Sequence, residues 1–595
     1  MLLLAFGACK VEEANNDDDD GGSGGRSGNG GSSGNAGSGG GAALDCGDVP
    51  ASGRCIDNGT AIEYCRTPPP NDQGRQGPPT TVRVDCLAGV ESCRELADGT
   101  AACELDQAAG VVCRPGDTLC EGDTLRACSA DGKAFEETDC AADGQSCRTP
   151  PQQPAQCVAF SSAGGNAPRL SGAVKFERRG MSETGPTGIT VDAAWLDFVA
   201  IYNGDKYIGS DVTDADGKFD AELTEPANED TTVYVFAMDF DATTQQPLVA
   251  VVRNDDPGIT TQTSTDYWFW SNKDYQGTNG QGTITVDGDN ATMSEFVIPE
   301  RDGAGALRVF QWIRYGMLRL DDPAGLTGSN GLESTKGKPQ QTVAVFWSPG
   351  VDSVCGACFL GKQGGGALVK PKDTTTEDHY DTLMQISGSN GSPTHWSYSV
   401  LSHETGHWTM ANYSRSPGEG GQHFVGQASK PGLAWSEGWA TAFGQWNSSD
   451  TFGGEYDPVY FDTQDGTTFW VNIATAAYTG GALQKPDPAG GIDQFINENV
   501  VSSMVWHLWH PEQARFSAAP GGTDAGTYAG AGDDAMFRAV QSDRILRDQY
   551  NRGYFKVDLV DFYDAVTCGG GASDGNVGDV SADVGFPWDS DPTCP

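Results

Sequence analysis

The sequence predicts a multidomain protein that combines two small disulfide-rich modules, a β-sandwich and an α+β domain of catalytic type. Three observations predict this organisation. A chain of 595 residues is too long for a single hydrophobic core. Twelve of its 17 cysteines fall within residues 46–157, as in small disulfide-stabilised modules. Short strand-like runs separated by turns follow, and from about residue 300 strand patterns alternate with helical ones.

The composition excludes several classes of function. The formal net charge is −45, and the acidic residues are spread along the chain. Such a charge repels phosphate backbones and anionic lipid surfaces, so we expect no nucleic-acid partner. The sequence contains no apolar run of about 20 residues, so no segment is predicted to span a membrane.

The first nine residues form a short apolar run that ends in a cysteine (MLLLAFGAC). This pattern resembles a bacterial lipoprotein signal, in which Cys9 becomes the lipidated first residue. It departs from that signal because Phe6 replaces the usual leucine and no basic residue precedes the apolar run. A plain secretory signal is the alternative.

Residues 10–44 form an Asp/Gly/Ser-rich linker. This composition cannot bury enough apolar surface to fold, so we expect a flexible tether. A lipid on Cys9 followed by a tether would hold a folded body clear of a surface. We therefore predict a location at the bacterial cell envelope or outside the cell, with membrane contact only through that lipid.

Residues 45–158 hold two sets of six cysteines. In both sets the last three cysteines are separated by 7 and then 10 residues, which indicates a duplicated module. Zinc knuckles need closely spaced C-x2-4-C pairs, and this segment has none. Disulfides formed in an oxidising compartment are therefore predicted, but the spacing does not choose among the pairings. The sets are Cys46, Cys55, Cys65, Cys86, Cys93 and Cys103, then Cys113, Cys120, Cys128, Cys140, Cys147 and Cys157.

Residues 169–255 predict a β-sandwich. Short strand-like runs are separated by turn signals, among them Asn-Gly at 203–204 and Asp-Gly at 216–217. The acidic residues at 214–217 have only part of the spacing of a calcium loop, so a hairpin turn is predicted there. The stretch TDADGKF resembles the carboxypeptidase-regulatory-like sandwiches of secreted peptidases, which implies a structural domain without chemistry of its own.

The block 300–595 predicts the α+β domain. Apolar residues between 306 and 318 recur at near-helical spacing, and the runs 342–347 and 383–386 predict strands. Further helices are expected around 396–411, 434–446, 496–510 and 556–566.

Cys355 and Cys358 form a CxxC pair in this block. The pair lies in a predicted loop and not in the strand-to-helix unit that redox-active CxxC motifs use. We therefore expect a structural disulfide, or pairing with Cys568 and Cys594, and no oxidoreductase chemistry.

A metal-binding pattern occurs at residues 403–407, where the sequence is HETGH. On a helix, His403 and His407 project from the same face about one turn apart, which allows two imidazole nitrogens to bind one Zn²⁺. Glu404 is rotated about 100° from His403, so its carboxylate is directed past the metal at a bound water. Zinc lowers the pKa of such a water, and the carboxylate can accept its proton. The pattern predicts a zinc site with Glu404 as the general base.

A catalytic zinc needs a third protein ligand and an open fourth position. The residue six beyond His407 is Tyr413, which excludes the HExxHxxGxxH pattern. His423 and Glu437 remain as candidates. His423 lies in a glycine-rich loop, whereas Glu437 lies on a predicted helix fixed by an aromatic stripe that we expect to be core. We therefore predict Glu437 as the third ligand. The stripe consists of Trp435, Trp439, Phe443 and Trp446.

HExxH followed by the segment WSEGWA resembles the gluzincin metallopeptidases. The resemblance covers the motifs and implies a zincin-like fold for most of 300–568. It also implies zinc bound by His403, His407 and Glu437, and hydrolysis of peptide bonds in extracellular or envelope proteins.

Two features depart from the gluzincin pattern. The 29 residues between His407 and Glu437 exceed the spacing in the best-known members. Thr441 occupies a place where some members carry an aspartate behind the metal ligands, so the residues that support the ligands stay open.

Peptide hydrolysis also needs a hydrogen-bond donor for the developing oxyanion. We predict His507 for this role, with His423 as an alternative, and either histidine could instead be structural. Glu498 begins the same predicted helix as His507 and is expected to support the site or to serve as an N-terminal helix charge. A strand near 381–387 is expected to pair with the substrate backbone.

A function of another class is the alternative. The cysteine-rich repeats and the sandwich also fit a non-catalytic surface adhesion or scaffold lipoprotein with a zincin-like fold. The intact Glu404 argues against this alternative, because a site that only binds does not need a base.

Overall fold

The computed structural model describes most of the chain from residue 49 to residue 594. The exceptions are residues 51–52, 67–79, 87, 96–100, 107–108, 114, 116–117, 122–123, 144, 149–155, 160–166, 240–246, 255–265, 278, 321–330, 354, 362–366, 370–377, 420–422, 424–425, 453–457, 465, 475–476, 480–483, 510–530, 553–555 and 591–593. The predicted signal with Cys9 and the whole of the predicted tether, residues 10–44, lie outside the described residues. Within the described part, no helix is long and apolar enough to cross a membrane.

The first six-cysteine set folds as a small β unit, and its described residues belong to one compact unit within 1–69 and 76–106. A three-stranded antiparallel sheet is accompanied by a hairpin. Disulfides join Cys55 to Cys93 and Cys86 to Cys103. The strands are β1 (Arg54–Ile56), β2 (Ala61–Arg66), β3 (Thr80–Asp85), β4 (Glu91–Glu95) and β5 (Ala101–Leu105).

The second six-cysteine set has the same plan, a three-stranded antiparallel sheet and a hairpin. Disulfides join Cys113 to Cys128 and Cys140 to Cys157. In both sets the fourth and sixth cysteines pair across 17 residues, in line with duplication. The disulfides fit an extracellular or envelope location. The strands are β6 (Thr118–Glu121), β7 (Thr124–Cys128), β8 (Phe135–Asp139), β9 (Gln145–Arg148) and β10 (Gln156–Ala159).

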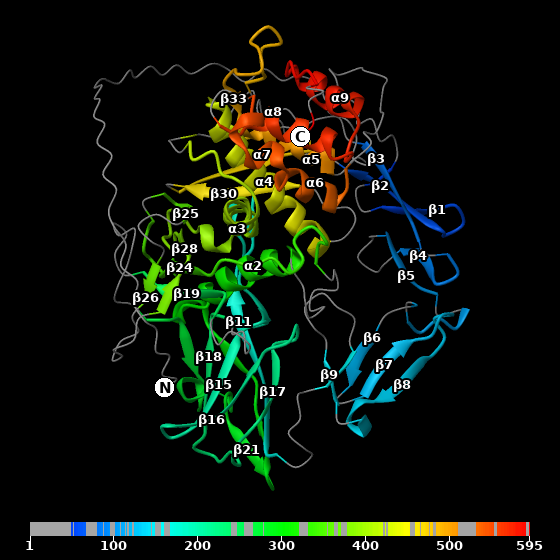
Figure 1. Ribbon diagram of the computed structural model, residues 1–595. Coiled ribbons are helices and arrows are strands. Elements are labelled where there is room, and N and C mark those ends of the chain that lie inside the picture. The colour runs from blue at the N-terminus through cyan, green and yellow to red at the C-terminus, as the bar shows by residue number, and fades with distance from the viewer. Residues whose placement is uncertain are drawn as a thin grey trace, which may run out of the picture. The chain divides into compact units, whose positions relative to one another are not determined.

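Two sheets then pack face to face (Figure 1). The first has the order β14-β11-β22-β21, with β17 and β23 also paired to β11, and the second has the order β16-β15-β18-β20. Inward side chains of both sheets, such as Phe176 and Val235, are fully buried in one core. The strands are β11 (Arg169–Arg178), β14 (Thr190–Ala193), β15 (Phe198–Asn203), β16 (Lys206–Val212), β17 (Lys218–Glu222), β18 (Thr232–Phe236), β20 (Phe269–Ser271), β21 (Ile284–Asp287), β22 (Asn290–Met293) and β23 (Phe296–Ile298).

The sandwich differs in extent from the predicted range of 169–255. Strands β20 to β23, all beyond residue 255, complete its two sheets, whereas β19 (Val249–Arg253) leaves it and pairs with β24 (Val343–Trp347) of the next sheet. Pairing between two strands that lie this far apart in the sequence cannot be predicted from the local pattern of hydrophobic residues. The 214–217 segment is the predicted turn: Gly217 has φ +75°, and its N–H donates to the Asp214 carbonyl at 2.9 Å.

A four-stranded sheet with the order β19-β24-β28-β25 carries the second half of the protein. Strand β28 (Thr382–Ile386) is buried throughout and lies between β24 and β25 (Ala357–Gly361). The prediction that a strand near 381–387 is free to pair with substrate is therefore wrong, because both of its edges are already paired. The antiparallel strand β25 occupies the edge, and a disulfide joins Cys355 to Cys358 at its start.

The predicted helices form, and their ends lie within about three residues of the predicted ones, except that the helix predicted at 434–446 continues to Phe452. Helix α2 (Gly305–Leu320) lies between the sandwich and helix α3 (Tyr398–Tyr413), and α4 (Pro431–Phe452) packs between α3 and α5 (Glu498–Trp509) (Figure 1). The stripe of Trp435, Trp439, Phe443 and Trp446 is fully buried core, as expected. Smaller strands are β12 (Met181–Ser182), β13 (Gly185–Pro186), β26 (Ala367–Val369), β27 (Asp378–Tyr380), β29 (Ala428–Ser429), β30 (Val459–Gln464), β31 (Thr467–Asn472), β32 (Ala477–Tyr478) and β33 (Ile496–Asn497), and a one-turn helix is α1 (Asn272–Tyr275).

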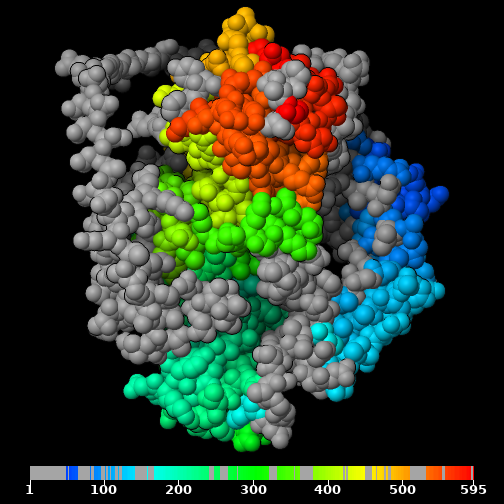
Figure 2. Space-filling model, in the orientation of Figure 1, coloured from blue at the N-terminus to red at the C-terminus, as the bar shows by residue number. Residues whose placement is uncertain are grey.

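The chain ends in helices α6 (Asp533–Val540), α7 (Asp543–Leu546), α8 (Leu559–Cys568) and α9 (Asp574–Val584). On the face shown in Figure 2 these orange and red helices form one continuous surface. Helix α8 packs on α4, where the Phe562 ring stacks on Trp435 with ring centroids 4.7 Å apart. The C-terminal helices therefore support the helix that carries Glu437.

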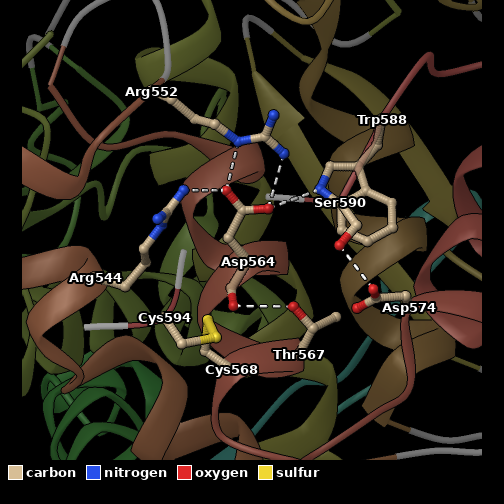
Figure 3. The surroundings of a disulfide bond; sticks show 9 residues. All are labelled: Arg544, Arg552, Asp564, Thr567, Cys568, Asp574, Trp588, Ser590 and Cys594. Carbon is tan, nitrogen blue, oxygen red and sulfur yellow. Dashed lines mark hydrogen bonds and ion pairs between the residues drawn. A yellow bond between two sulfur atoms is a disulfide. The ribbon is translucent and has the colours of Figure 1, made fainter. Parts of the chain in front are cut away.

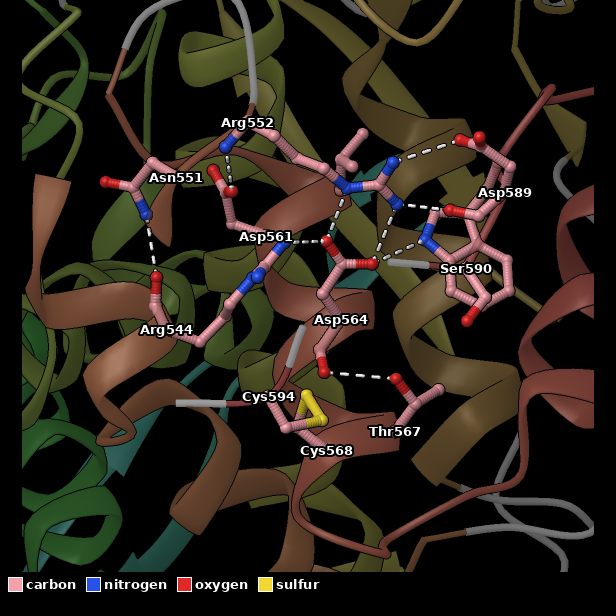
Figure 4. Close-up of polar contacts among 12 residues, drawn as sticks. Arg544, Asn551, Arg552, Asp561, Asp564, Thr567, Cys568, Asp589, Ser590 and Cys594 are labelled. Carbon is pink, nitrogen blue, oxygen red and sulfur yellow. Dashed lines mark hydrogen bonds and ion pairs between the residues drawn. A yellow bond between two sulfur atoms is a disulfide. The ribbon is translucent and has the colours of Figure 1, made fainter. Parts of the chain in front are cut away.

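A buried carboxylate fixes this C-terminal region. Asp564 of α8 accepts hydrogen bonds from Arg544 at 2.5 Å, from Arg552 at 2.6 and 2.9 Å, and from the Trp588 indole at 3.2 Å (Figure 3). Arg552 also binds Asp589 (Figure 4). The Cys568–Cys594 disulfide ties the end of the chain to the same helix. The CxxC pair therefore forms the local disulfide Cys355–Cys358 and does not pair with Cys568 and Cys594.

Candidate metal centre

Helix α3 presents the two histidines of the HETGH segment. The helix begins after Ser397, whose side chain accepts a hydrogen bond from the Val400 N–H at 3.3 Å. His403 and His407 lie one turn apart on the same face, and their Nε2 atoms are 3.1 Å apart. Both side chains are largely buried, with 11% and 15% of their surface exposed.

Glu437 completes a triangle of ligand atoms. Its Oε2 lies 3.2 Å from Nε2 of His403 and 3.1 Å from Nε2 of His407. Three donors bound tetrahedrally at about 2.0–2.1 Å would be roughly 3.3 Å apart, close to these separations. Within the described residues, these three side chains form the group that could hold a metal ion. Unprotonated imidazole nitrogens and a carboxylate at this spacing repel one another unless a cation or a proton lies between them.

Small residues bring the two helices close enough for this geometry. A Cβ on Gly406 would lie 2.7 Å from the Cα of Ala440, and a Cβ on Gly444 would lie 3.0 Å from the backbone nitrogen of His403. Larger side chains at either position would push α4 away from α3. The glycine of HETGH and the one that follows WSEGWATAF therefore set the distance between the histidines and Glu437.

Hydroxyl groups support the two histidines from behind. The Thr441 Oγ1 lies 3.0 Å from Nδ1 of His403, and the Ser436 Oγ lies 3.4 Å from Nδ1 of His407. A neutral imidazole that donates from Nδ1 leaves its Nε2 lone pair free to bind a metal. The sequence left these supporting groups open, and the structure places a threonine and a serine there.

The charges of the group are strongly coupled. Burial lowers the pKa of His403, which favours the neutral imidazole that a metal needs. Burial also opposes charge on His407, but the charge of Glu437, the hydrogen bond to Glu437 and the charge of Glu404 together outweigh burial and raise the pKa of His407. Burial by itself would raise the pKa of Glu437, yet the cationic His407 and the hydrogen bonds from both histidines hold it well below its usual range. The site thus favours an ionised carboxylate and attracts positive charge.

Glu404 lies beside the triangle and is not one of its corners. Its side chain is buried, and among the described residues its Oε2 has no hydrogen-bond partner. Burial, reinforced by the negative charge of Glu437, raises the pKa of Glu404 to about 7 against the effect of His407. A buried carboxylate with one unpaired oxygen and a pKa near neutrality has the properties of a general base.

His423 lies at the rim of the same site. Its Nδ1 is 2.8 Å from Oε2 of Glu498, and its Nε2 is 3.8 Å from Oε2 of Glu437. Burial opposes its protonation, but the hydrogen bond that it donates to Glu498 and the negative charge of Glu437 prevail and raise the pKa of His423 to about 9. The structure places Glu437 in the triangle and His423 outside it, and Glu498 holds His423.

His507 occupies a different environment. It is fully buried on α5, and its Nε2 lies 2.8 Å from the carbonyl oxygen of Ala474, after strand β31. The Nε2 atom of His507 is therefore hydrogen-bonded to the backbone just after strand β31. The structure gives His507 the surroundings of a core histidine, and its oxyanion role stays a prediction.

Tyr460 is a site residue that the sequence analysis missed. Its ring packs edge-on against His403 with ring centroids 5.8 Å apart. Burial raises the pKa of Tyr460 well above its usual range, and the negative charge of Asp462 and then those of Glu404, Glu498 and Glu437 add to the effect. Its hydroxyl is therefore neutral and able to donate a hydrogen bond. Its strand, β30, lies well outside both motifs, so no local signal marked it.

Comparison with known proteins adds no identification. No family model matches the chain, and no curated protein matches it. The candidate site therefore depends on its own geometry and chemistry.

Proposed function

We propose that this protein is a zinc-dependent peptidase of gluzincin type that acts on extracellular or envelope proteins. The observation that carries the proposal is the triangle of His403, His407 and Glu437 beside the unpaired oxygen of Glu404. Two histidines and a carboxylate with an adjacent general base form the donor set of catalytic zinc sites that keep one open position.

The metal ligands in this proposal are Nε2 of His403, Nε2 of His407 and Oε2 of Glu437. Two nitrogens and one oxygen suit Zn²⁺ better than the oxygen-rich sites of Ca²⁺ or Mg²⁺. A zinc ion held by these three side chains would supply a water of lowered pKa and would polarise the carbonyl to be attacked. Thr441 and Ser436 hold the histidine rings in the orientation that directs Nε2 inward.

Glu404 acts as the base. Its Oε2 accepts the proton of the attacking water, and the carboxylic acid that results returns this proton to the leaving amine. Tyr460 and His423 lie within the same site and are the candidate donors to the developing oxyanion.

The edge strand β25 is the proposed binding surface for the substrate backbone. Among the described residues it pairs with β28 alone, and it packs against the metal-site helix α3. An extended peptide can add to such an edge as a further strand, so that its backbone runs past Glu404. This role replaces the one that the sequence analysis gave to 381–387.

The location is part of the proposal. The disulfides support an oxidising compartment, and a lipid on Cys9 would tether the enzyme to the outer surface of an envelope. The substrates would then be peptides or proteins exposed at that surface.

The test compares wild-type protein with Glu404→Gln. Glutamine keeps the shape of the side chain but cannot take up the proton, so peptide cleavage should fall by about 10² to 10⁴-fold. Zinc content and thermal stability should be unchanged, because Glu404 is not a ligand. A peptide library and an unfolded protein serve as substrates, with chelator inhibition as the control. A zinc-loaded wild type that cleaves none of these substrates would favour the scaffold alternative.

A further inference from the structure

The outer face of the β16-β15-β18-β20 sheet carries no charged side chain. The register places eleven side chains in three rows across the four strands, and all are aromatic, aliphatic or hydroxyl-bearing. We call this set the aromatic face. Its rows are Val212, Phe198, Phe236 and Phe269; then Ser210, Ala200, Tyr234 and Ser271; then Tyr207, Tyr202 and Thr232.

Six rings of this face form one connected group. Phe236 lies between Phe198 and Phe269, with ring centroids 5.9 and 5.5 Å away. Tyr234 contacts Phe269 and Tyr202 edge-on at 5.8 and 5.7 Å. The group stays accessible at its margins, where Tyr207 and Phe269 are 37% and 41% exposed. The opposite side of the sheet is ordinary sandwich core, so packing within the sandwich does not require these rings.

Hydroxyl groups accompany the rings. The Tyr207 hydroxyl donates to Ser210 at 2.7 Å, which places two oxygens at the β16 edge of the face. Tyr234 and Thr232 add two further hydroxyls on strand β18. Aromatic surfaces interleaved with donors and acceptors, with no charge among them, match a ligand that alternates C–H faces with hydroxyl groups.

The surroundings of the face are strongly acidic. Residues 169–298 contain 22 acidic and 8 basic residues, a net charge of −14, and the whole chain carries −45. This field repels nucleic acids, acidic polysaccharides and anionic lipid surfaces. It also opposes face-to-face association of two copies, which would bring two acidic rims together. A basic partner would be drawn to the rim and not to the uncharged centre.

We propose that the aromatic face binds a neutral polysaccharide chain. Pyranose rings present C–H groups on their faces and hydroxyls at their edges, so they can stack on Phe236 and Phe269, whose ring planes differ by 39°, and bond to the flanking hydroxyls. The neighbouring aromatic rings are separated by about the length of one hexose unit, and an open sheet face admits an extended polymer. Such binding would hold the protein on a glycan-rich surface through a site separate from the metal centre.

The experiment is co-sedimentation of the full-length protein with insoluble cellulose, chitin and β-1,3-glucan. The test variant is Tyr207→Ala/Phe269→Ala, because both side chains are exposed and their removal should leave the fold intact. The matched control is Ile189→Ala/Val191→Ala, which removes two apolar side chains that are 48% and 54% exposed on a different part of the sandwich. Thermal unfolding of all three proteins checks the fold.

We expect wild type and control to bind at least one of the polymers, and the test variant to bind at least roughly tenfold more weakly. Failure of all three polymers to retain wild type would overturn the proposal, as would equal retention of the test variant. If the wild type were a dimer in solution and the test variant a monomer, a second copy of the chain would cover the aromatic face, and this result would also contradict the proposal. None of these readouts depends on peptidase activity.

Discussion

The hydroxyl of Thr441 lies 3.0 Å from Nδ1 of His403, on the side of the ring opposite to the nitrogen that faces Glu437. Metal-binding histidines usually donate to a carboxylate, a carbonyl or a water from this position, and the partner fixes both the tautomer and the ring orientation. A threonine can accept the same hydrogen bond but carries no charge. The metal affinity of this site should therefore depend on a weak supporting contact.

Thr441→Val should weaken zinc binding by about 10- to 100-fold, because it removes the acceptor and keeps the shape of the side chain. Competition with a chromophoric chelator measures the change. Thr409→Val on α3 is the control, since its hydroxyl donates only to the Thr405 carbonyl within the helix. Thr441→Asp should strengthen zinc binding. Equal affinities for wild type, Thr441→Val and Thr441→Asp would contradict a supporting role for Thr441.

Loss of a corner of the triangle should release the metal, whereas loss of the rim histidine should not. Glu437→Gln should lower the zinc content of purified protein from about one per chain to near zero, because a neutral amide is a poor replacement for a carboxylate beside two imidazoles. His423→Ala should retain the zinc, because the Nε2 of His423 lies 3.8 Å from the ligand oxygen of Glu437. Metal analysis of each dialysed variant measures its zinc content per chain. If His423→Ala released the zinc and Glu437→Gln retained it, His423 and not Glu437 would be the third ligand.

The buried carboxylate of Asp564 should be essential for the stability of the C-terminal helices. Asp564→Asn removes the charge of the carboxylate that binds the buried Arg544 and leaves Arg552 with Asp589 alone of its two acidic partners, and removal of one member of a buried pair destabilises by about 3–5 kcal/mol. Chemical unfolding measures the loss. Asp589→Asn is the control, because Asp589 is 78% exposed and also binds Arg552. If Asp564→Asn and Asp589→Asn lowered the free energy of unfolding by similarly small amounts, the ion pairs of Asp564 would contribute little to stability.

Local sequence pattern predicted the helices that carry the site and the residues on them. Periodicity placed α3, α4 and α5 within a few residues, and the HExxH spacing put His403 and His407 on one face. The aromatic stripe on α4 supplied the reason to choose Glu437, since it fixed which helix face was core. These features are local, so they could be deduced without knowledge of the tertiary fold.

Features that depend on long-range pairing could not be deduced in this way. The position of β25 at the sheet edge follows from the order of strands that are far apart in sequence, and an apolar run such as 382–386 gives no sign of its neighbours. Tyr460 reaches the site through a β-hairpin that carries no catalytic motif. His507 was assigned from its residue type and helix, while its actual partner, the Ala474 carbonyl, lies 33 residues away.

The last prediction separates Tyr460 from His507 as the oxyanion donor. Tyr460→Phe removes one hydroxyl and keeps the ring that packs on His403, so zinc content and stability should change little. If that hydroxyl bonds to the oxyanion, kcat should fall by about 10²- to 10³-fold while KM changes far less. His507→Ala should show the opposite pattern, since it removes a fully buried side chain bonded to the Ala474 carbonyl. Its free energy of unfolding should fall by about 2–4 kcal/mol, and kcat per zinc-loaded molecule should stay near the wild-type value. Steady-state kinetics normalised to zinc content, together with urea unfolding of each variant, tests both expectations. A large loss of kcat in zinc-loaded His507→Ala, with Tyr460→Phe unaffected, would return the role to His507.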